Sequence, residues 1–185
     1  MNKTKGISVM ILCAIFIFSI ILPAATIAKD KKPAPVLNLR DINGKQVSSK
    51  ELLSNGPVII WFWNSCCGIK QKQLESLKSI YNTYKGQGLE IIAISEDGVK
   101  KTAKTKQAVK VKKIPFIIVM DKSKNLLGQF QAFAVPSIYV ITQDGKIHFT
   151  HSGYMPGDEK KLEAALAPLF KKEEKKEKDT EKKEG

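Results

Sequence analysis

Two adjacent cysteines and a lysine three residues further on are the side chains of this sequence best suited to chemistry. Cys66 and Cys67 follow the apolar run at 58–63, and Lys70 stands where the next helix is expected to begin. A cysteine at the amino end of a helix, close to a cation, is favoured as the nucleophilic thiolate. Cys67 is therefore the candidate catalytic nucleophile and Lys70 its thiolate stabiliser, with Cys66 as a neighbouring thiol.

Dithiol chemistry within one chain requires a second cysteine about one helical turn after the first. Neither register supplies it, because Lys70 follows Cys67 at that distance and Ile69 follows Cys66. A bridge between Cys66 and Cys67 would be strained, since Cα atoms about 3.8 Å apart lie below the roughly 4.4 Å lower limit of ordinary disulfides. We expect two free thiols or one mixed disulfide. The sequence leaves open whether the Cys67 thiol is reactive or inert.

The elements that position these residues follow from apolar patterning. Short runs rich in branched and aromatic residues at 58–63, 89–94, 116–120 and 138–141 predict buried strands. Leu74, Leu77, Tyr81 and Tyr84 have helical spacing before Gly86 and Gly88, a Lys-rich helix is expected around 99–111, and Asp158 opens a last helix. With the Asp144-Gly145 hairpin turn, this order predicts an α/β fold with a mixed central sheet sandwiched by helices.

Here the chain resembles the TlpA/ResA-type thioredoxin-like family (redoxin, AhpC/TSA-like) over residues 36–170. Members have Phe-Trp-x-x-Trp-Cys-x-x-Cys after a strand, then Val-Pro-Thr before a strand and an Asp-Gly turn. Phe62-Trp63, Cys67 and Val135-Pro136-Ser137 fall on these motifs, and Gly153 falls near the end of the sheet. The resemblance implies a thioredoxin-like fold, with Pro136 in the cis form beside the active cysteine and Val135 contacting the partner peptide.

Departures from the family pattern concern the chemistry. Lys70 occupies the slot of the second motif cysteine, and Gln73 that of an active-site glutamate. Cys66 occupies the slot of a tryptophan, so the resemblance implies a structural role for this thiol. Trp63 could form part of a substrate-binding wall, while alternation places Phe62 on the other sheet face and favours core packing for most of these rings.

The resemblance and the single motif cysteine suggest an exported protein of the thiol-disulfide oxidoreductase type with a monothiol site, acting in extracytoplasmic redox homeostasis or cytochrome c maturation. Full dithiol reductase activity is not expected. One alternative is a non-catalytic binding module that uses the cis-proline groove. A weaker alternative is a thiol peroxidase, because the single arginine, Arg40, lies well before the cysteines.

The two ends of the chain differ in composition from its middle. Residues 1–28, with two early lysines and then no charge from 6 to 28, predict a signal peptide or an amino-terminal membrane anchor. Either form places the rest of the chain outside the cytoplasm, in the periplasm or on the outer face of the membrane. Cys13 is an apolar residue of that segment, 29–35 is a linker, and 171–185 is expected to be a charged disordered tail.

Charge limits the partners. The net charge is +13, but 30 of the 31 basic residues are lysine, which disfavours sequence-specific nucleic-acid binding because bidentate contacts to bases come mainly from arginine. Nine lysines and two aspartates between 97 and 125 suit an acidic protein surface or an anionic membrane, beside partner thiols or peptides. His148 and His151 are expected on opposite strand faces, so neither a metal nor a cofactor is anticipated.

Overall fold

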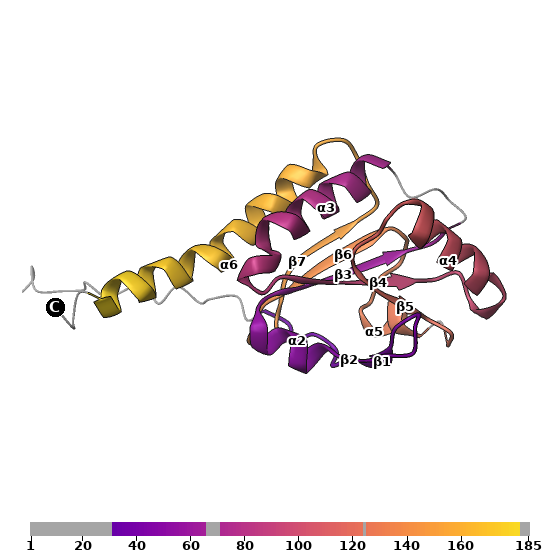
Figure 1. Cartoon of the computed structure of the whole chain (residues 1–185), viewed down its shortest axis with the longest axis horizontal. Coiled ribbons are helices and arrows are strands. Elements are labelled where there is room, and N and C mark those ends of the chain that lie inside the picture. The colour runs from indigo at the N-terminus through magenta and orange to yellow at the C-terminus, as the bar shows by residue number, and fades with distance from the viewer. Residues whose placement is uncertain (1–30, 66–70, 124, 182–185) are drawn as a thin grey trace, which may run out of the picture. The chain divides into compact units, whose positions relative to one another are not determined.

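A five-stranded mixed sheet forms the centre of the part of the chain that the computed structural model describes, residues 31–65, 71–123 and 125–181 (Figure 1). Its order is β5-β4-β3-β6-β7, with β3, β4 and β5 parallel and β6 and β7 antiparallel to their neighbours. The strands are β3 Val58–Trp63, β4 Glu90–Ser95, β5 Ile117–Met120, β6 Ser137–Ile141 and β7 Ile147–Ser152. This confirms the predicted α/β class with a mixed central sheet.

The central strand β3 is buried along its whole length, because helices cover both faces of the sheet. Its odd-numbered side chains pack on one face and its even-numbered side chains on the other, as the period of a strand requires. Phe62 therefore lies across the sheet from Trp61 and Trp63, which confirms the alternation predicted from the sequence.

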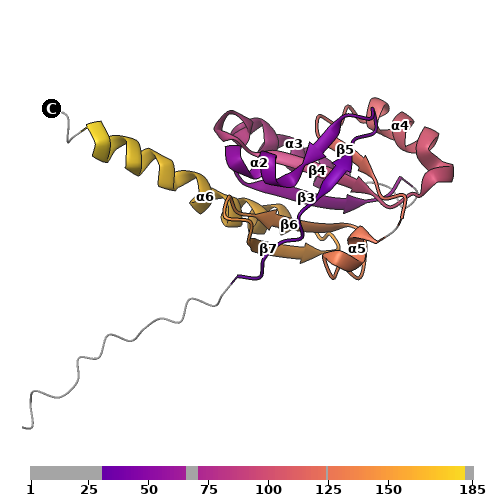
Figure 2. The same ribbon diagram turned by 90° about the horizontal axis from the view of Figure 1, so that it is seen from below.

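Helices α3 (Gln71–Tyr84) and α6 (Asp158–Glu181) cover one face side by side, as Figures 1 and 2 both show. Leu74, Leu77 and Ile80 of α3 meet Leu162 and Leu166 of α6 over the odd-numbered residues of β3. The helix α4 (Thr102–Val111), preceded by the 3₁₀ turn η2 (Val99–Lys101), packs Ala108 and Val109 on the same cluster. A 3₁₀ turn, η1 (Lys85–Gln87), ends α3 at Gly88, where a Cβ would lie 2.0 Å from the Asn55 carbonyl oxygen.

The other face is covered by short elements that the sequence analysis did not predict. These are the hairpin β1 (Asn38–Arg40) and β2 (Gln46–Ser48), the helix α2 (Ser49–Asn55) and the helix α5 (Leu126–Gln129). Ser48 caps α2 by accepting from the Glu51 N–H, so the Ser-x-x-Glu capping box was present in the sequence as a signal.

The chain enters the sheet at the first residues that the structure describes. Pro33 pairs with Lys146, the Ala34 N–H donates to the Gly145 carbonyl at 2.8 Å, and the Ile147 N–H donates to the Lys32 carbonyl at 2.8 Å. This contact lies at the beginning of β7, and β3 begins at the same end of the sheet. Residues 31–34 are therefore fixed at the end of the sheet remote from the carboxyl end of β3.

The carboxyl-terminal end differs from expectation. In place of a disordered tail from 171, α6 continues to Glu181. Lysine and glutamate are good helix formers, and pairs of opposite charge three or four residues apart support a helix without a core. Stacking of Tyr84 on Phe170, with ring centroids 4.4 Å apart, joins α6 to the end of α3. No helix of the described ranges is long and apolar enough to span a membrane.

Candidate active site

The carboxyl ends of β3 and β4 and the amino end of β6 meet at one edge of the sheet, where Phe62 pairs with Ser137 and Trp63 with Ser95. The loop that follows β3 is the predicted site. Cys66, Cys67 and Lys70 lie outside the described residues, as does Cys13. The residues that bracket this segment, Ser65 and Gln71, are described, and their contacts define the surroundings of the site.

Asp97, just beyond β4, holds Ser65 in place through its carboxylate. One carboxylate oxygen accepts from the Ser65 N–H at 3.0 Å and the other at 2.9 Å, and the Ser65 hydroxyl adds a third bond at 3.0 Å. The hydroxyls of Ser95 and Thr105 each donate to the same carboxylate at 2.8 Å. Burial raises the pKa of Asp97, but these hydrogen bonds outweigh it and bring the pKa below its ordinary value, so the group is a carboxylate.

Asp97 was not among the site residues predicted from the sequence. It stands three residues beyond the predicted strand 89–94, which as β4 runs parallel to β3, and loops after parallel strands meet at one edge. This position after a parallel strand was the signal in the sequence that could have identified Asp97 as a site residue.

Gln71, the first residue of α3, is contacted from α4. Lys112 Nζ donates to Gln71 Oε1 at 3.5 Å, while the Gln71 amide nitrogen donates to Glu75 at 2.7 Å. Thr105, also on α4, reaches Asp97 and through it Ser65. Ser65 and Gln71, the described residues on either side of 66–70, are thus linked to α4 and to Lys112, the residue that follows it.

Trp63 does not form the binding wall that was expected. It is 2% exposed and stacks on Trp61, with ring centroids 5.6 Å apart and planes inclined by 16°. Trp61 meets Phe116 edge to face at 6.3 Å. The burial of β3 on both faces places Trp63 in the core, and its indole N–H has no hydrogen-bond partner among the described residues.

Gln73, in the slot of the family glutamate, is 3% exposed. Its amide nitrogen has no partner among the described residues, and the side chain lines a small cavity between α3, β7 and the start of α6. His151, Tyr154 and Asp158 also line this cavity. An amide at this position cannot exchange a proton as a carboxyl group would.

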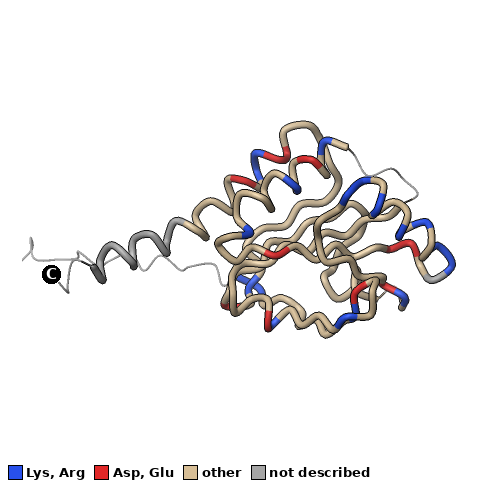
Figure 3. Tube along the Cα trace, in the orientation of Figure 1, with Lys and Arg blue, Asp and Glu red and all other residues tan. Residues whose placement is uncertain are grey.

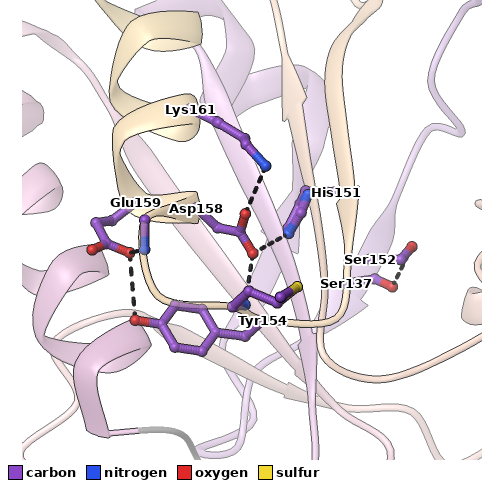
Figure 4. A network of polar contacts seen from close by, with 9 residues as sticks. Ser137, His151, Ser152, Tyr154, Asp158, Glu159 and Lys161 are labelled. Atoms are coloured by element: carbon purple, nitrogen blue, oxygen red, sulfur yellow. Dashed lines mark hydrogen bonds and ion pairs between the residues drawn. The ribbon is translucent and has the colours of Figure 1, made fainter.

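Asp158, which lines that cavity, makes hydrogen bonds that join β7 to the start of α6 (Figure 4). Asp158 Oδ2 bonds His151 Nε2 at 2.7 Å and accepts from the Met155 N–H at 2.7 Å, and Lys161 Nζ donates to Oδ1 at 3.0 Å. The hydrogen bond from Lys161, then that from Met155, lower the pKa of Asp158 to about 2. The carboxylate therefore stays ionised at the start of α6, where negative charge is stabilised.

The prediction that His148 and His151 lie on opposite faces is wrong. Val140 pairs with Phe149 and Ile141 with Ile147, so His148 is the extra residue of a β-bulge. His148 Nε2 bonds the Ala165 carbonyl at 3.0 Å, and His151 bonds Asp158, so both rings face α6. They have separate partners, and the described residues contain no group of three side chains suited to a metal ion.

The loop before β6 carries the predicted binding residues. The Val135–Pro136 peptide bond is cis, and the Pro136 carbonyl accepts from the Gly153 N–H at 2.8 Å. The Ser137 hydroxyl donates to the Ala134 carbonyl at 2.6 Å and lies 3.2 Å from that of Ser152 (Figure 4). No hydrogen bond joins the main chain of Val135 to another described residue.

Two large apolar side chains stand exposed in the loops of this edge. Phe133, two residues before Val135, is 97% exposed, and Met155, between β7 and α6, is 71% exposed. Phe133 precedes β6 and Met155 follows β7, and the beginning of β6 pairs with the end of β7, so both loops lie at this edge of the sheet. Neither residue was predicted from the sequence to belong to the site.

Comparisons with known proteins agree with this architecture. Residues 31–150 match the AhpC/TSA family. The chain is 30% identical over 116 residues to a thiol-disulfide oxidoreductase ResA of Bacillus cereus, a match covering 63% of this chain and 65% of that protein, just under two thirds. It is 26% identical over 152 residues to ResA of Bacillus subtilis (strain 168), covering 81% of this chain and 83% of that protein.

Solved structures show the same fold. A crystal structure of a putative thiol:disulfide interchange protein DsbE from Chlorobium tepidum aligns with a TM-score of 0.69 at 21% identity, covering 76% of this chain and 96% of that one. The solution structure of a thioredoxin-like protein from Porphyromonas gingivalis aligns with a TM-score of 0.64 at 24% identity, covering 75% and 92%.

Proposed function

Because this chain belongs to the AhpC/TSA family, as a thioredoxin-like protein of the TlpA/ResA type, we propose that it exchanges thiols and disulfides with partner proteins through the single motif cysteine, Cys67. Relatives named thiol-disulfide oxidoreductase support the class of reaction. The apolar segment within residues 1–28 supports export, and a role in cytochrome c maturation or redox homeostasis outside the cytoplasm is part of the proposal.

The observation that carries the proposal is the set of hydrogen bonds made by Ser65 and Gln71, the described residues on either side of 66–70. Asp97 fixes the main chain of Ser65 and Lys112 reaches Gln71, so the segment starts and ends at positions set by buried or hydrogen-bonded groups. Val135, whose main-chain N–H and carbonyl bond no other described residue, precedes β6 at the same edge of the sheet. A partner strand could pair there while its sulfur meets Cys67.

The reaction is a single exchange. The Cys67 thiolate attacks one sulfur of a partner disulfide, a new S–S bond forms, and the other partner sulfur leaves as a thiolate that takes a proton from solvent. Lys70 stands in the place of a resolving cysteine, so an external thiol must attack the mixed disulfide and free Cys67. The pathway needs no cofactor.

One observation favours a second function, a binding module without chemistry. Gln73 replaces the family glutamate and is buried, with an amide nitrogen that has no partner among the described residues, so the proton-handling group is absent as well as the second thiol. The exposed Phe133 would then serve binding alone. A peroxidase is disfavoured because the guanidinium of Arg40 donates to the Gly44 carbonyl, in the turn between β1 and β2.

The test is thiol labelling followed by mass spectrometry. Exchange predicts that Cys67 alkylates faster than Cys66 near neutral pH, and that Lys70→Ala slows Cys67 a few-fold by removing a thiolate-stabilising charge. Lys72→Ala, an exposed lysine of α3, is the matched control and leaves the rate unchanged. Equal, slow labelling of both sulfurs would support the binding module instead.

A further inference from the structure

A groove, here called the hairpin groove, lies between β1 and the end of β5, the outermost strand of the central sheet. It is lined by residues 36–42 along β1 and 119–123 at the end of β5, together with Lys106 of α4 and Gln129 of α5. Its volume is about 820 Å³, within the roughly 300–1,000 Å³ of small-molecule sites. The lining includes none of Ser65, Asp97 and Val135, so the hairpin groove is not part of the candidate active site.

Three cationic side chains line the hairpin groove, each from a different segment of the chain. Arg40 ends β1, Lys106 lies on α4, and Lys122 follows β5. All three side chains are exposed. Within the described ranges none of them has a carboxylate within ion-pair distance. Cations gathered in a concave surface without an internal counter-ion attract an anion from the solvent.

Arg40 is the single arginine among the 31 basic residues. Its guanidinium donates to the Gly44 carbonyl at 3.0 Å, which holds the side chain beside the turn of the hairpin. This bond uses one of the five N–H donors of a guanidinium. Arginine presents its donors as a planar fork that matches the oxygens of a carboxylate or phosphate, which lysine does not. Arg40 is therefore the lining residue best suited to orient an anionic ligand.

Two carboxylates also line the hairpin groove, and the chain itself engages both. Asp41 Oδ1 accepts from the N–H groups of Asn43 and Lys45, each at 2.8 Å. Asp121 is 2% exposed and accepts from the Leu126 N–H at 2.8 Å. These bonds stabilise the turns after β1 and β5. The two carboxylates therefore serve the local fold, and the lining cations keep their attraction for an external anion.

The surroundings of the hairpin groove strengthen this attraction. Seven lysines and no acidic residue occur between positions 98 and 120, and Figure 3 shows basic positions along α4 and on the β1–β2 hairpin. The remaining walls include the apolar side chains of Leu39, Val119 and Leu126. Apolar walls lower the local dielectric constant, so a charge on the lining acts more strongly on a ligand inside than it would on an open surface.

We propose that the hairpin groove binds a small soluble molecule with two or more phosphate or carboxylate groups. Arg40 binds one anionic group in its fork, and Lys106 and Lys122 stabilise the remaining charge. Lipid headgroups carry the same anionic groups, but cations that line a groove suit a molecule that enters it, whereas a membrane meets the most protruding side chains. This binding goes beyond the proposed exchange reaction and uses none of its residues.

The experiment is isothermal titration calorimetry of the full chain in a non-ionic detergent at low salt. The probes are tripolyphosphate and citrate, with the uncharged triethyl ester of citrate as the neutral control. We expect at least one of the two anions to bind with a single site per chain, the ester not to bind, and the affinity to fall as salt rises. Binding of neither anion would overturn the proposal.

Paired substitutions locate the binding. Arg40→Gln with Lys122→Gln removes two lining cations and should weaken binding on the order of tenfold or more. The matched pair Lys72→Gln with Lys160→Gln makes the same change in net charge at exposed lysines outside the hairpin groove, and should leave the affinity within about twofold. Circular dichroism checks that both pairs fold. Equal losses in the two pairs would mean attraction to net charge alone, and the site would be rejected.

Two single variants make the test independent of the hairpin. Lys106→Gln, on α4, should weaken binding several-fold, and unchanged affinity there would contradict a site built from all three cations. Arg40→Lys keeps the charge without the fork, so it should recover only part of the affinity lost in Arg40→Gln. Full recovery would remove the orienting role given to the guanidinium.

Sedimentation with phosphatidylglycerol vesicles distinguishes the lipid source of the same anionic group. Vesicle binding that the Arg40→Gln and Lys122→Gln pair abolishes, while neither soluble anion binds, would assign the hairpin groove to a lipid headgroup and overturn the proposal. Vesicle binding that survives in this pair, together with loss of the soluble anion, supports a soluble ligand.

Discussion

Asp97 binds the main-chain N–H of Ser65 with both of its carboxylate oxygens, at 3.0 and 2.9 Å. Asp97, which follows β4, thereby holds the main chain that follows β3. The residue it holds, Ser65, directly precedes Cys66. The same carboxylate also accepts hydrogen bonds from the hydroxyls of Ser95 and Thr105. It therefore joins the loop after β3 to β4 and α4.

Asp97→Asn should destabilise the fold and alter the reactivity of Cys67. An amide keeps one acceptor oxygen in place of two, which leaves buried donors unpaired at a cost of about 1–3 kcal/mol. Denaturant unfolding measures the loss, and alkylation rates report the effect on Cys67. Asp144→Asn, in an exposed turn, is the control and should change stability by less than about 0.5 kcal/mol. Indistinguishable effects of the two variants would contradict the role given to Asp97.

Acidification should weaken the fold through His148. Burial and the nearby Lys31 lower the pKa of His148, against the raising effect of its bond to the Ala165 carbonyl. The unfolded chain then binds the proton more readily, so this contribution is full above about pH 6.5 and falls as pH drops toward the lowered pKa. Denaturant midpoints measured from pH 8 to pH 5 report this loss of folding stability. Its size should be of the order expected for the titration of one histidine. His148→Gln should flatten the profile, and an unchanged profile in that variant would assign the titration elsewhere.

Asp158→Asn should loosen the beginning of α6. The carboxylate accepts from the Met155 N–H, His151 and Lys161, and an amide satisfies fewer of these partners. Hydrogen exchange of the first-turn amides of α6 should speed up, while the exposed Glu163→Gln on the same helix leaves them unchanged. Because the pKa of Asp158 is lowered to about 2, the contribution is present above its ordinary value of 3.8 and is lost as pH falls toward 2. A difference between wild type and variant that vanished already near neutral pH would be inconsistent with this carboxylate.

Lys70→Cys combined with Gln73→Glu should create dithiol chemistry. One helical turn brings positions 67 and 70 within disulfide reach, and a carboxyl group at the 3% exposed position 73 would have a raised pKa suited to proton transfer. The double variant should oxidise reversibly and reduce a model protein disulfide in a Cys67-dependent way, whereas wild type hardly does so. Mass spectrometry after mild oxidation identifies the bridge. If 67 and 70 form none, the assignment of Cys67 to the helix start is wrong.

The sheet was predictable because its signals are local. The runs that became β3, β4, β5 and β6 are short, branched and bounded by turn residues, and the Asp144-Gly145 turn fixed the hairpin of β6 and β7. The elements β1, β2 and α5 were missed because three or four residues carry too little periodicity.

The site was less predictable than the fold. Cys67 and Lys70 could be chosen from residue types, but the contact of Asp97 with Ser65 joins positions 32 residues apart. The exposure of Phe133 and the burial of Trp63 depend on which faces the helices cover. The bulge at His148 reverses an expectation that rests on strict alternation, since one inserted residue turns a side chain to the other face.

Pairing of residues 32–34 with 145–147 fixes where the described chain joins the sheet. The polypeptide enters at the start of β7, and the strand β3 of six residues separates that end of the sheet from Ser65, a span of roughly 20 Å. Contacts made by residues 31–34 or by the turn at 144–146 therefore fall at the end of β3 opposite to Ser65, and a protein bound to either would leave the Ser65 end of the sheet uncovered.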